Sequence, residues 1–200
     1  MLETRRDQLT ALAAGSGVFL VSTALAWDDE IPPGEEPLFE FINGWPDWIA
    51  WPLYPVMQFG MVLAPFVAGA LAWFLTRKRQ PAIALVSTGF GMWLFAKLVK
   101  LVVDRPRPGG LSLDQAINYR LDGGPDGLGF VSGHAVVGFA IAVIATPYVG
   151  NRGAALLWAL ATGAATLRVY VGAHLPLDSI GGAGLGIAAG AVALLVVRRR

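Results

Sequence analysis

The sequence predicts an all-α membrane protein, a polytopic bundle of six transmembrane helices with a short amphipathic interfacial helix between the first two spans. Hydrophobic residues make up 55% of the 200 residues and charged residues only 14%, whereas a soluble globular chain carries roughly 25% charged residues. Apolar stretches of about 18 residues or more, long enough to cross a hydrocarbon core, recur along the whole chain. This pattern is typical of a membrane protein.

The same composition excludes several classes of function. A formal net charge of +1 indicates no general attraction to nucleic acid. Without a cysteine, the chain has no disulfide, no thiolate chemistry and no cysteine-based metal site. No repeat or low-complexity segment divides the sequence, and we expect one domain over residues 1–200.

Six apolar segments are candidate spans. They cover residues 9–27, 49–75, 82–103, 130–149, 154–171 and 179–197. The first follows Arg5 and Arg6 and superficially resembles a signal peptide, but it is longer than a usual signal core, so we expect a retained helix. The second contains Pro52, Pro55 and Pro65, which predict a tilted or kinked helix.

The basic residues predict the orientation. With six spans, nine of them lie on one side: Arg5, Arg6, Arg77, Lys78, Arg79, Arg152, Arg198, Arg199 and Arg200. The positive-inside rule makes that side, and therefore both termini, cytoplasmic. The abundance of Ala, Gly, Val and Arg, without a sorting signal, indicates a bacterial plasma membrane.

Three segments are expected on the opposite, extracytoplasmic side: 28–48, 104–129 and 172–178. In the first, EEPLFEFINGW predicts the amphipathic interfacial helix. Trp45, Trp48 and Trp51 suit an aromatic belt at the membrane surface.

A cluster of ionisable residues is predicted at that extracytoplasmic boundary. The basic residues outside the cytoplasmic group are Lys97, Lys100, Arg105, Arg107, Arg120 and Arg168. The only two histidines, His134 and His174, lie at the same level, together with Ser132 and Asp178. Ionisable groups are costly in a membrane, so their presence there indicates a functional site.

The cations and the start of the fourth span suit a phosphate. Lys100 supplies a point charge, and Arg107 and Arg168 supply planar forks that match phosphate oxygens. Ser132 and Gly133 stand where the span begins, so backbone N–H groups there would point at an anion.

The two histidines suit covalent catalysis. Asp178 lies four residues after His174, and Pro176 between them suits a helix start. The carboxylate can then accept from one ring nitrogen of His174 and leave the other free to attack. His134, from another segment, could protonate a leaving oxygen, which contributes about 10²–10⁴-fold in rate.

Three segments carrying these residues resemble the signatures of the type 2 phosphatidic acid phosphatase (PAP2) superfamily. KLVVDRPRP (100–108) is similar to K-x6-R-P, VSGH (131–134) to P-S-G-H, and LRVYVGAHLPLD (167–178) to S-R-x5-H-x3-D. The three occur in the expected order with both internal spacings intact. Two positions depart from the pattern, since Val131 replaces the usual Pro and Leu167 the usual Ser.

The resemblance implies a role for each matching residue. His174 would form a phosphohistidine, Asp178 would orient it, and His134 would act as general acid. The phosphoryl group would be held by Lys100, Arg107, Ser132, Gly133 and Arg168. The resemblance also implies that the reaction needs neither a metal nor another cofactor.

Simpler roles are expected for the remaining residues. Lys97 is expected to reach the interface, and Arg120 to lie on the surface of a polar loop. Asp104 and Arg105 are expected to form a solvated loop pair or a brace for the site. The last span has glycines expected to allow close helix packing, namely Gly181, Gly182, Gly184 and Gly186.

The expected function is hydrolysis of a lipid phosphate or diphosphate, with polyprenyl diphosphate, phosphatidylglycerol phosphate and phosphatidate as candidate substrates. Two alternatives stay open: transfer of a phosphoryl or phosphoglycosyl group to another acceptor, and lipid binding or transport without catalysis. The expected partners are the lipid substrate and membrane lipids, with no nucleic acid. The sequence predicts no oligomeric state.

Overall fold

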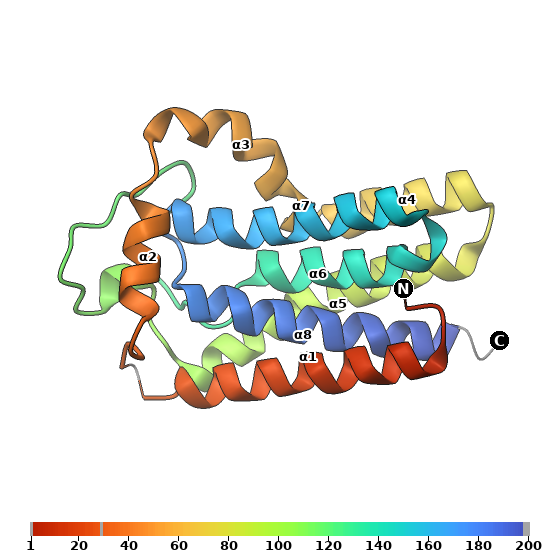
Figure 1. Cartoon of the computed structure of the whole chain (residues 1–200), viewed down its shortest axis with the longest axis horizontal. Helices are drawn as coiled ribbons and strands as arrows, with labels where there is room; N and C mark the ends of the chain where they lie inside the picture. Colours follow the sequence, from red (N-terminus) through yellow and green to blue (C-terminus); the bar gives the residue numbers. More distant parts are fainter. Residues whose placement is uncertain (1, 29, 198–200) are drawn as a thin grey trace.

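The computed structural model describes residues 2–28 and 30–197, which fold into helices and connecting loops without strands. Helices α1, α5, α6, α7 and α8 run along the long axis of the molecule, and α2 crosses one end of this bundle (Figure 1). The α helices are α1 (Arg5–Leu25), α2 (Glu35–Asn43), α3 (Ala50–Met57), α4 (Ala64–Thr76), α5 (Arg79–Val103), α6 (Gly133–Ala145), α7 (Asn151–Tyr170) and α8 (Pro176–Val197). The 3-10 helices are η1 (Asp47–Ile49), η2 (Gln58–Gly60), η3 (Pro108–Gly110) and η4 (Thr146–Tyr148).

Three described helices, α1, α5 and α8, are long and apolar enough to cross a membrane. A fourth span is possible where Asp47–Gly60 and Ala64–Thr76 form a pair bent by 71°. Pro55 lies inside α3 and Pro65 at the start of α4, so the predicted kink has its expected cause. The prediction of an all-helical membrane protein is therefore confirmed.

The two ends of the bundle differ in what they carry. The start of α1, the end of α8 and the connections α4–α5 and α6–α7 lie at one end (Figure 1). Helix α2 and the long loop between α5 and α6 lie at the other. The predicted cytoplasmic residues Arg198, Arg199 and Arg200 lie outside the described residues.

Helix α8 packs against α1 and α6 through glycines. A Cβ on Gly182 would lie 2.7 Å from the carbonyl oxygen of Ser132, and one on Gly184 would lie 2.8 Å from that of Gly15. These contacts confirm that the glycines of α8 allow close helix packing. The same approach aligns the starts of α6 and α8, where the amide of Ser132 donates to the carbonyl of Asp178 at 3.0 Å.

The long loop between α5 and α6 closes on itself at its base. The amide of Arg107 donates to the carbonyl of Gly127 at 3.0 Å, and the amide of Gly129 donates to that of Arg105 at 2.7 Å. These hydrogen bonds join the segment that follows α5 to the segment that precedes α6. They therefore carry Arg105 and Arg107 over the end of the helical bundle.

Arg120 fastens the rest of this loop, so the prediction that it lies on the surface is wrong. Its side chain is 9% exposed and forms an ion pair with Asp47 at 2.7 Å. It also donates to the backbone carbonyls of Asn43, Trp45 and Tyr170. The reason is that the polar loop folds back on α2 and the end of α7. The backbone carbonyls at the ends of these helices need hydrogen-bond donors, and an arginine side chain supplies several N–H groups at once.

Candidate active site

The predicted site residues come from four helix ends, one long loop and one turn, all at the α2 end of the bundle. Lys100 lies in the last turn of α5 and Arg168 in the last turn of α7, while Asp178 lies in the first turn of α8. Ser132 is the N-cap of α6, followed by Gly133 and His134. Arg107 lies in the long loop, and His174 lies in the turn between α7 and α8.

His174 and Asp178 form a buried pair. Nδ1 of His174 lies 3.3 Å from Oδ2 of Asp178, and the two side chains are 4% and 0% exposed. The same oxygen accepts from the amide of Leu175 at 3.0 Å. When the carboxylate is ionised it can only accept, which would place the proton on Nδ1 and leave the lone pair of Nε2 free. In that state Nε2 can act as a nucleophile.

The three predicted cations keep donors free. Nζ of Lys100 donates to the carbonyls of Leu128 and Gly129, each at 2.6 Å, so one of its three N–H donors remains. Nη1 of Arg168 donates to Asp122 at 2.6 Å. Nε of Arg168 and Nε of Arg107 have no hydrogen-bond partner, although both atoms are buried. Each side chain can therefore still bind an anion.

Unpartnered buried atoms gather on the predicted phosphate-binding residues. The described residues contain four such side-chain atoms: Nε of Arg105, Nε of Arg107, Nε of Arg168 and Oγ of Ser132. Ser132 caps α6 without using its hydroxyl, although serine at this position commonly bonds the helix backbone. A buried polar group without a partner costs about 1–3 kcal/mol. Three of the four thus belong to residues of the predicted phosphate-binding set.

Several charged side chains act electrostatically on His174. Burial lowers the pKa of His174 well below its usual value, and the charges of Lys100, Arg168, Arg107 and His134 lower it further. Burial and the charge of Arg168 also lower the pKa of Arg107. The imidazole of His174 is therefore neutral at neutral pH, as a nucleophile must be. A bound anion would relieve the repulsion among the cations.

His134 lies against the break between α3 and α4. A Cβ on Gly60 would overlap the carbonyl oxygen of His134, so only glycine allows this approach. Arg168 contacts the same region, because its Nη1 lies 3.6 Å from the sulfur of Met57. The bent segment thus lies behind His134 and Arg168 and supports both.

A cavity of about 600 Å³ lies beside the site, between α3 and the long loop. Its lining includes Trp51, Tyr54, Arg120 and Asp122. Asp122 is 47% exposed and pairs with Arg168. Asp122 therefore separates this cavity from the buried cations.

Four residues at the site have contacts that the sequence analysis did not predict: Glu35, Arg105, Arg120 and Asp122. Arg105 is fully buried and contacts Glu35 and Asp178, so it is no solvated loop residue; its position fits the alternative of a brace. Its place within the segment that matches K-x6-R-P was the one signal for it. Asp104 is exposed and ends α5 in a left-handed conformation.

The two departures from the signatures lie in apolar surroundings. Val131 is fully buried in a cluster with Phe130 and Val136. Leu167 packs with Ala50 and Met57. Neither side chain adds a polar group to the site.

Within the part of the chain that the structure describes, no group of three or more His, Cys, Asp or Glu side chains is placed to hold a metal ion.

Comparisons with known proteins point in the same direction. A family model described as the PAP2 superfamily matches residues 80–200. The fold is similar to that of LpxE from Aquifex aeolicus, with 22% identity, a TM-score of 0.63, and coverage of 80% of this chain and 93% of that one. It is also similar to a transmembrane PAP2 type phosphatidylglycerolphosphate phosphatase from Bacillus subtilis, with 20% identity, a TM-score of 0.65, and coverage of 93% and 94%. No curated protein matches the chain.

Proposed function

The chain belongs to the PAP2 superfamily, and from this premise we propose that it hydrolyses a lipid phosphate or diphosphate through a phosphohistidine on His174. One observation carries the proposal. The unpartnered donors of Arg107, Arg168 and Ser132 belong to the predicted phosphate-binding set, and both arginines act electrostatically on His174. A phosphoryl group would satisfy the donors and lie next to the nucleophile.

The reaction has two steps. In the first, Nε2 of His174 attacks phosphorus, the bond to the leaving oxygen breaks, and His134 gives that oxygen a proton. In the second, water attacks the phosphohistidine while neutral His134 takes a proton from it, so the N–P bond breaks and phosphate leaves. Asp178 accepts from Nδ1–H of His174 throughout. The cations stabilise the negative oxygens of each transition state.

The proposed topology has six spans. Four are the candidates already described, namely α1, the bent pair, α5 and α8. The fifth is α6 together with η4, and the sixth is α7. Both termini would be cytoplasmic and the site extracytoplasmic, in a bacterial plasma membrane. The arrangement in Figure 1 supports this, because the start of α1 and the end of α8 lie at the opposite end of the bundle from α2 and the long loop. The basic connections then lie on the cytoplasmic side.

Helix α2 is proposed to lie at the membrane interface. Its buried face consists of Glu35, Phe39 and Asn43. Leu38 and Phe41 are exposed, at 43% and 68%. An apolar face turned away from the protein suits contact with the headgroup region.

The apolar part of the substrate has a groove available to it. This groove has a volume of about 570 Å³, lies between α4, α6 and α7, and is lined mainly by apolar side chains. One end of it lies at the bent segment that packs against His134. Representative lining residues are Phe59, Leu71, Ile141 and Leu160. An acyl or prenyl chain there would leave its phosphate at the cations.

The proposed function is tested by phosphate release from purified protein with a panel of phosphatidate, phosphatidylglycerol phosphate and polyprenyl diphosphate, in the presence of EDTA. We expect release from at least one lipid, unchanged by EDTA and inhibited by vanadate. Product analysis with added alcohols identifies transfer in place of hydrolysis. Lipid binding without turnover across the panel would overturn the proposal in favour of a binding protein.

Arg107→Lys is expected to weaken phosphate recognition while it keeps the charge. Lysine replaces a planar fork by a point charge, and a hydrogen bond to a charged group contributes about 1.5–3 kcal/mol. We therefore expect kcat/KM to fall by about 10–100-fold and the inhibition constant of vanadate to rise. Arg152→Lys, in the first turn of α7 at the far end of the bundle, is the matched control. Unchanged vanadate affinity in Arg107→Lys would exclude Arg107 from the phosphate site.

A further inference from the structure

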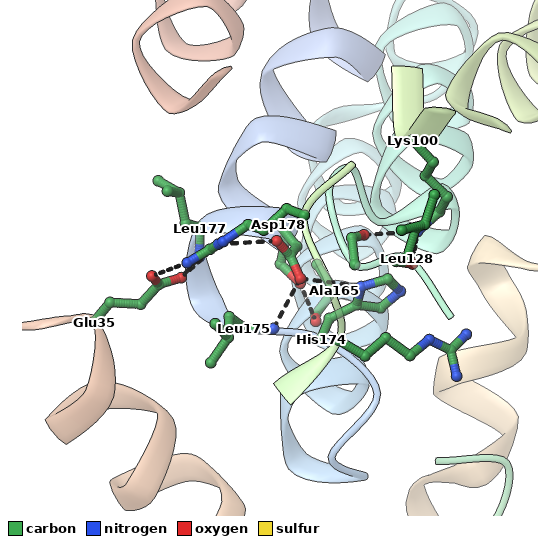
Figure 2. Close-up of polar contacts among 12 residues, drawn as sticks. Glu35, Lys100, Leu128, Ala165, His174, Leu175, Leu177 and Asp178 are labelled. Atoms are coloured by element: carbon green, nitrogen blue, oxygen red, sulfur yellow. Dashed lines mark hydrogen bonds and ion pairs between the residues drawn. The ribbon is translucent and has the colours of Figure 1, made fainter. Parts of the chain in front are cut away.

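We propose that Glu35 and Arg105 are positioning residues that set the orientation and charge of Asp178, and through it the reactivity of His174. This inference rests on the proposed function and extends its site to α2, a helix outside the three signatures. Glu35 lies in the first turn of α2, and Arg105 lies just after α5. Figure 2 shows Asp178 between Glu35 on one side and His174 on the other.

Arg105 joins the two carboxylates directly. Its Nη2 lies 2.6 Å from Oε2 of Glu35, and its Nη1 lies 3.3 Å from Oε1 of Glu35. The same Nη1 lies 3.1 Å from Oδ1 of Asp178. The side chain of Arg105 is 0% exposed. Oε1 of Glu35 also accepts from the amide of Leu177 at 2.8 Å, next to Asp178 in α8.

The two oxygens of Asp178 have separate tasks. Oδ1 faces Arg105, and Oδ2 faces Nδ1 of His174 and the amide of Leu175. Rotation of the carboxylate would break both sets of contacts. Arg105 therefore fixes the plane of the carboxylate, and that plane determines where Nδ1 of His174 is held.

Glu35 also determines the net charge of this buried group. Burial alone would lower the pKa of Arg105, but the hydrogen bonds and charges of Glu35 and Asp178 raise it, so the guanidinium stays charged. Glu35, Arg105 and Asp178 then carry one net negative charge. Attack on phosphorus places positive charge on the ring of His174, which that negative charge stabilises. Without Glu35, Arg105 would cancel the charge of Asp178.

A purely structural role explains these contacts poorly. A buried ion pair contributes little net stability, because desolvation offsets much of the attraction. Helix α2 is anchored without it, since the side chain of Asn43 bonds the carbonyls of Asn118 and Tyr170 and Phe39 is buried against Val169 and Leu175. Loss of the Glu35 charge should therefore leave α2 in place.

The test is Glu35→Gln, which keeps the shape of the side chain and an acceptor for Leu177 but removes the charge. We expect kcat to fall by about 10–100-fold. This is the size of effect found when a residue that orients a metal ligand through a hydrogen bond is replaced, and Glu35 and Arg105 would orient Asp178 in the same way. KM should stay within about twofold, because Glu35 does not touch the phosphate. Glu36→Gln is the matched control: Glu36 also lies in the first turn of α2, and it bonds the amide of Asp114 at 2.7 Å instead of Arg105.

Glu35→Asp separates charge from shape. It keeps the charge with a shorter side chain, so it should retain more activity than Glu35→Gln. Active-site titration by trapped phosphoenzyme corrects kcat for any unfolded fraction. If Glu35→Gln does not fold, the double variant Glu35→Gln with Arg105→Met leaves no buried cation unbalanced, and its kcat should still be reduced because Oδ1 of Asp178 has lost its partner.

Three results would overturn the inference: unchanged kcat in folded Glu35→Gln or in the double variant, an equal loss in Glu36→Gln, or less activity in Glu35→Asp than in Glu35→Gln. Wild-type protein inactive on every lipid phosphate would instead contradict the proposed function. The two failures are therefore distinguishable.

Discussion

His174→Ala is expected to abolish phosphate release, with a loss of at least about 10⁴-fold in kcat, because the proposed covalent intermediate forms on His174. The imidazole is held by Asp178 at 3.3 Å, and alanine removes the attacking nitrogen while leaving the cations in place. Phosphate should therefore still bind. The measurement is turnover of a lipid phosphate by protein purified in detergent, together with acid-labile labelling by a radioactive substrate.

The labelling distinguishes a lost nucleophile from a lost fold. His174→Ala should bind vanadate and elute as wild-type protein does, yet show no phosphoenzyme. Lys97→Ala is the control, since Nζ of Lys97 lies 3.9 Å from the centre of the Trp93 ring and not among the site cations. Wild-type turnover by folded His174→Ala would remove the basis of the proposed mechanism.

The sequence was sufficient for those parts of the site that depend on local spacing. His174 and Asp178 are four residues apart at a helix start, and the structure brings them together. Ser132 begins α6 because an apolar helical run follows a loop rich in glycine, and serine is favoured at a helix start. Each of these expectations needed only the chain within one turn of a helix.

The contacts that escaped the sequence analysis join distant parts of the chain. Glu35 and Arg105 are 70 residues apart, and Arg105 and Asp178 are 73 apart. An arginine between Asp104 and Pro106 has the appearance of a solvated loop residue, and only the approach of α2 buries it. Asp122 likewise acquires its partner 46 residues away because the long loop folds over the end of α7. No local pattern encodes such pairings.

The span count shows the same division between local and long-range information. The sequence predicted six spans, whereas three of the described helices, α1, α5 and α8, are long and apolar enough to cross a membrane. Helix α6 has only 13 residues and continues through η4, yet nearly all of it is buried. The reason is its central position between α5, α7 and α8. Its burial therefore depends on its neighbours more than on its own length.

His134→Ala is expected to lower kcat for lipid monoesters by about 10²–10⁴-fold, the contribution of a positioned general acid. An alkoxide leaves poorly without a proton, whereas nitrophenolate or a phosphate leaves readily. The loss in the first step should therefore be much smaller for p-nitrophenyl phosphate, and smaller for a diphosphate than for a monoester. The second step still needs a base to take a proton from water, so the phosphohistidine should accumulate in this variant.

This accumulation separates the two histidines, since His174→Ala forms no phosphoenzyme while His134→Ala should retain it. Quenched-flow labelling with p-nitrophenyl phosphate measures both the burst and the decay. Equal losses for good and poor leaving groups, with no trapped intermediate, would show that His134 only helps to hold the phosphate. That result would fit its position in the first turn of α6, beside the unpartnered hydroxyl of Ser132. The dependence on the leaving group therefore decides between proton transfer and binding.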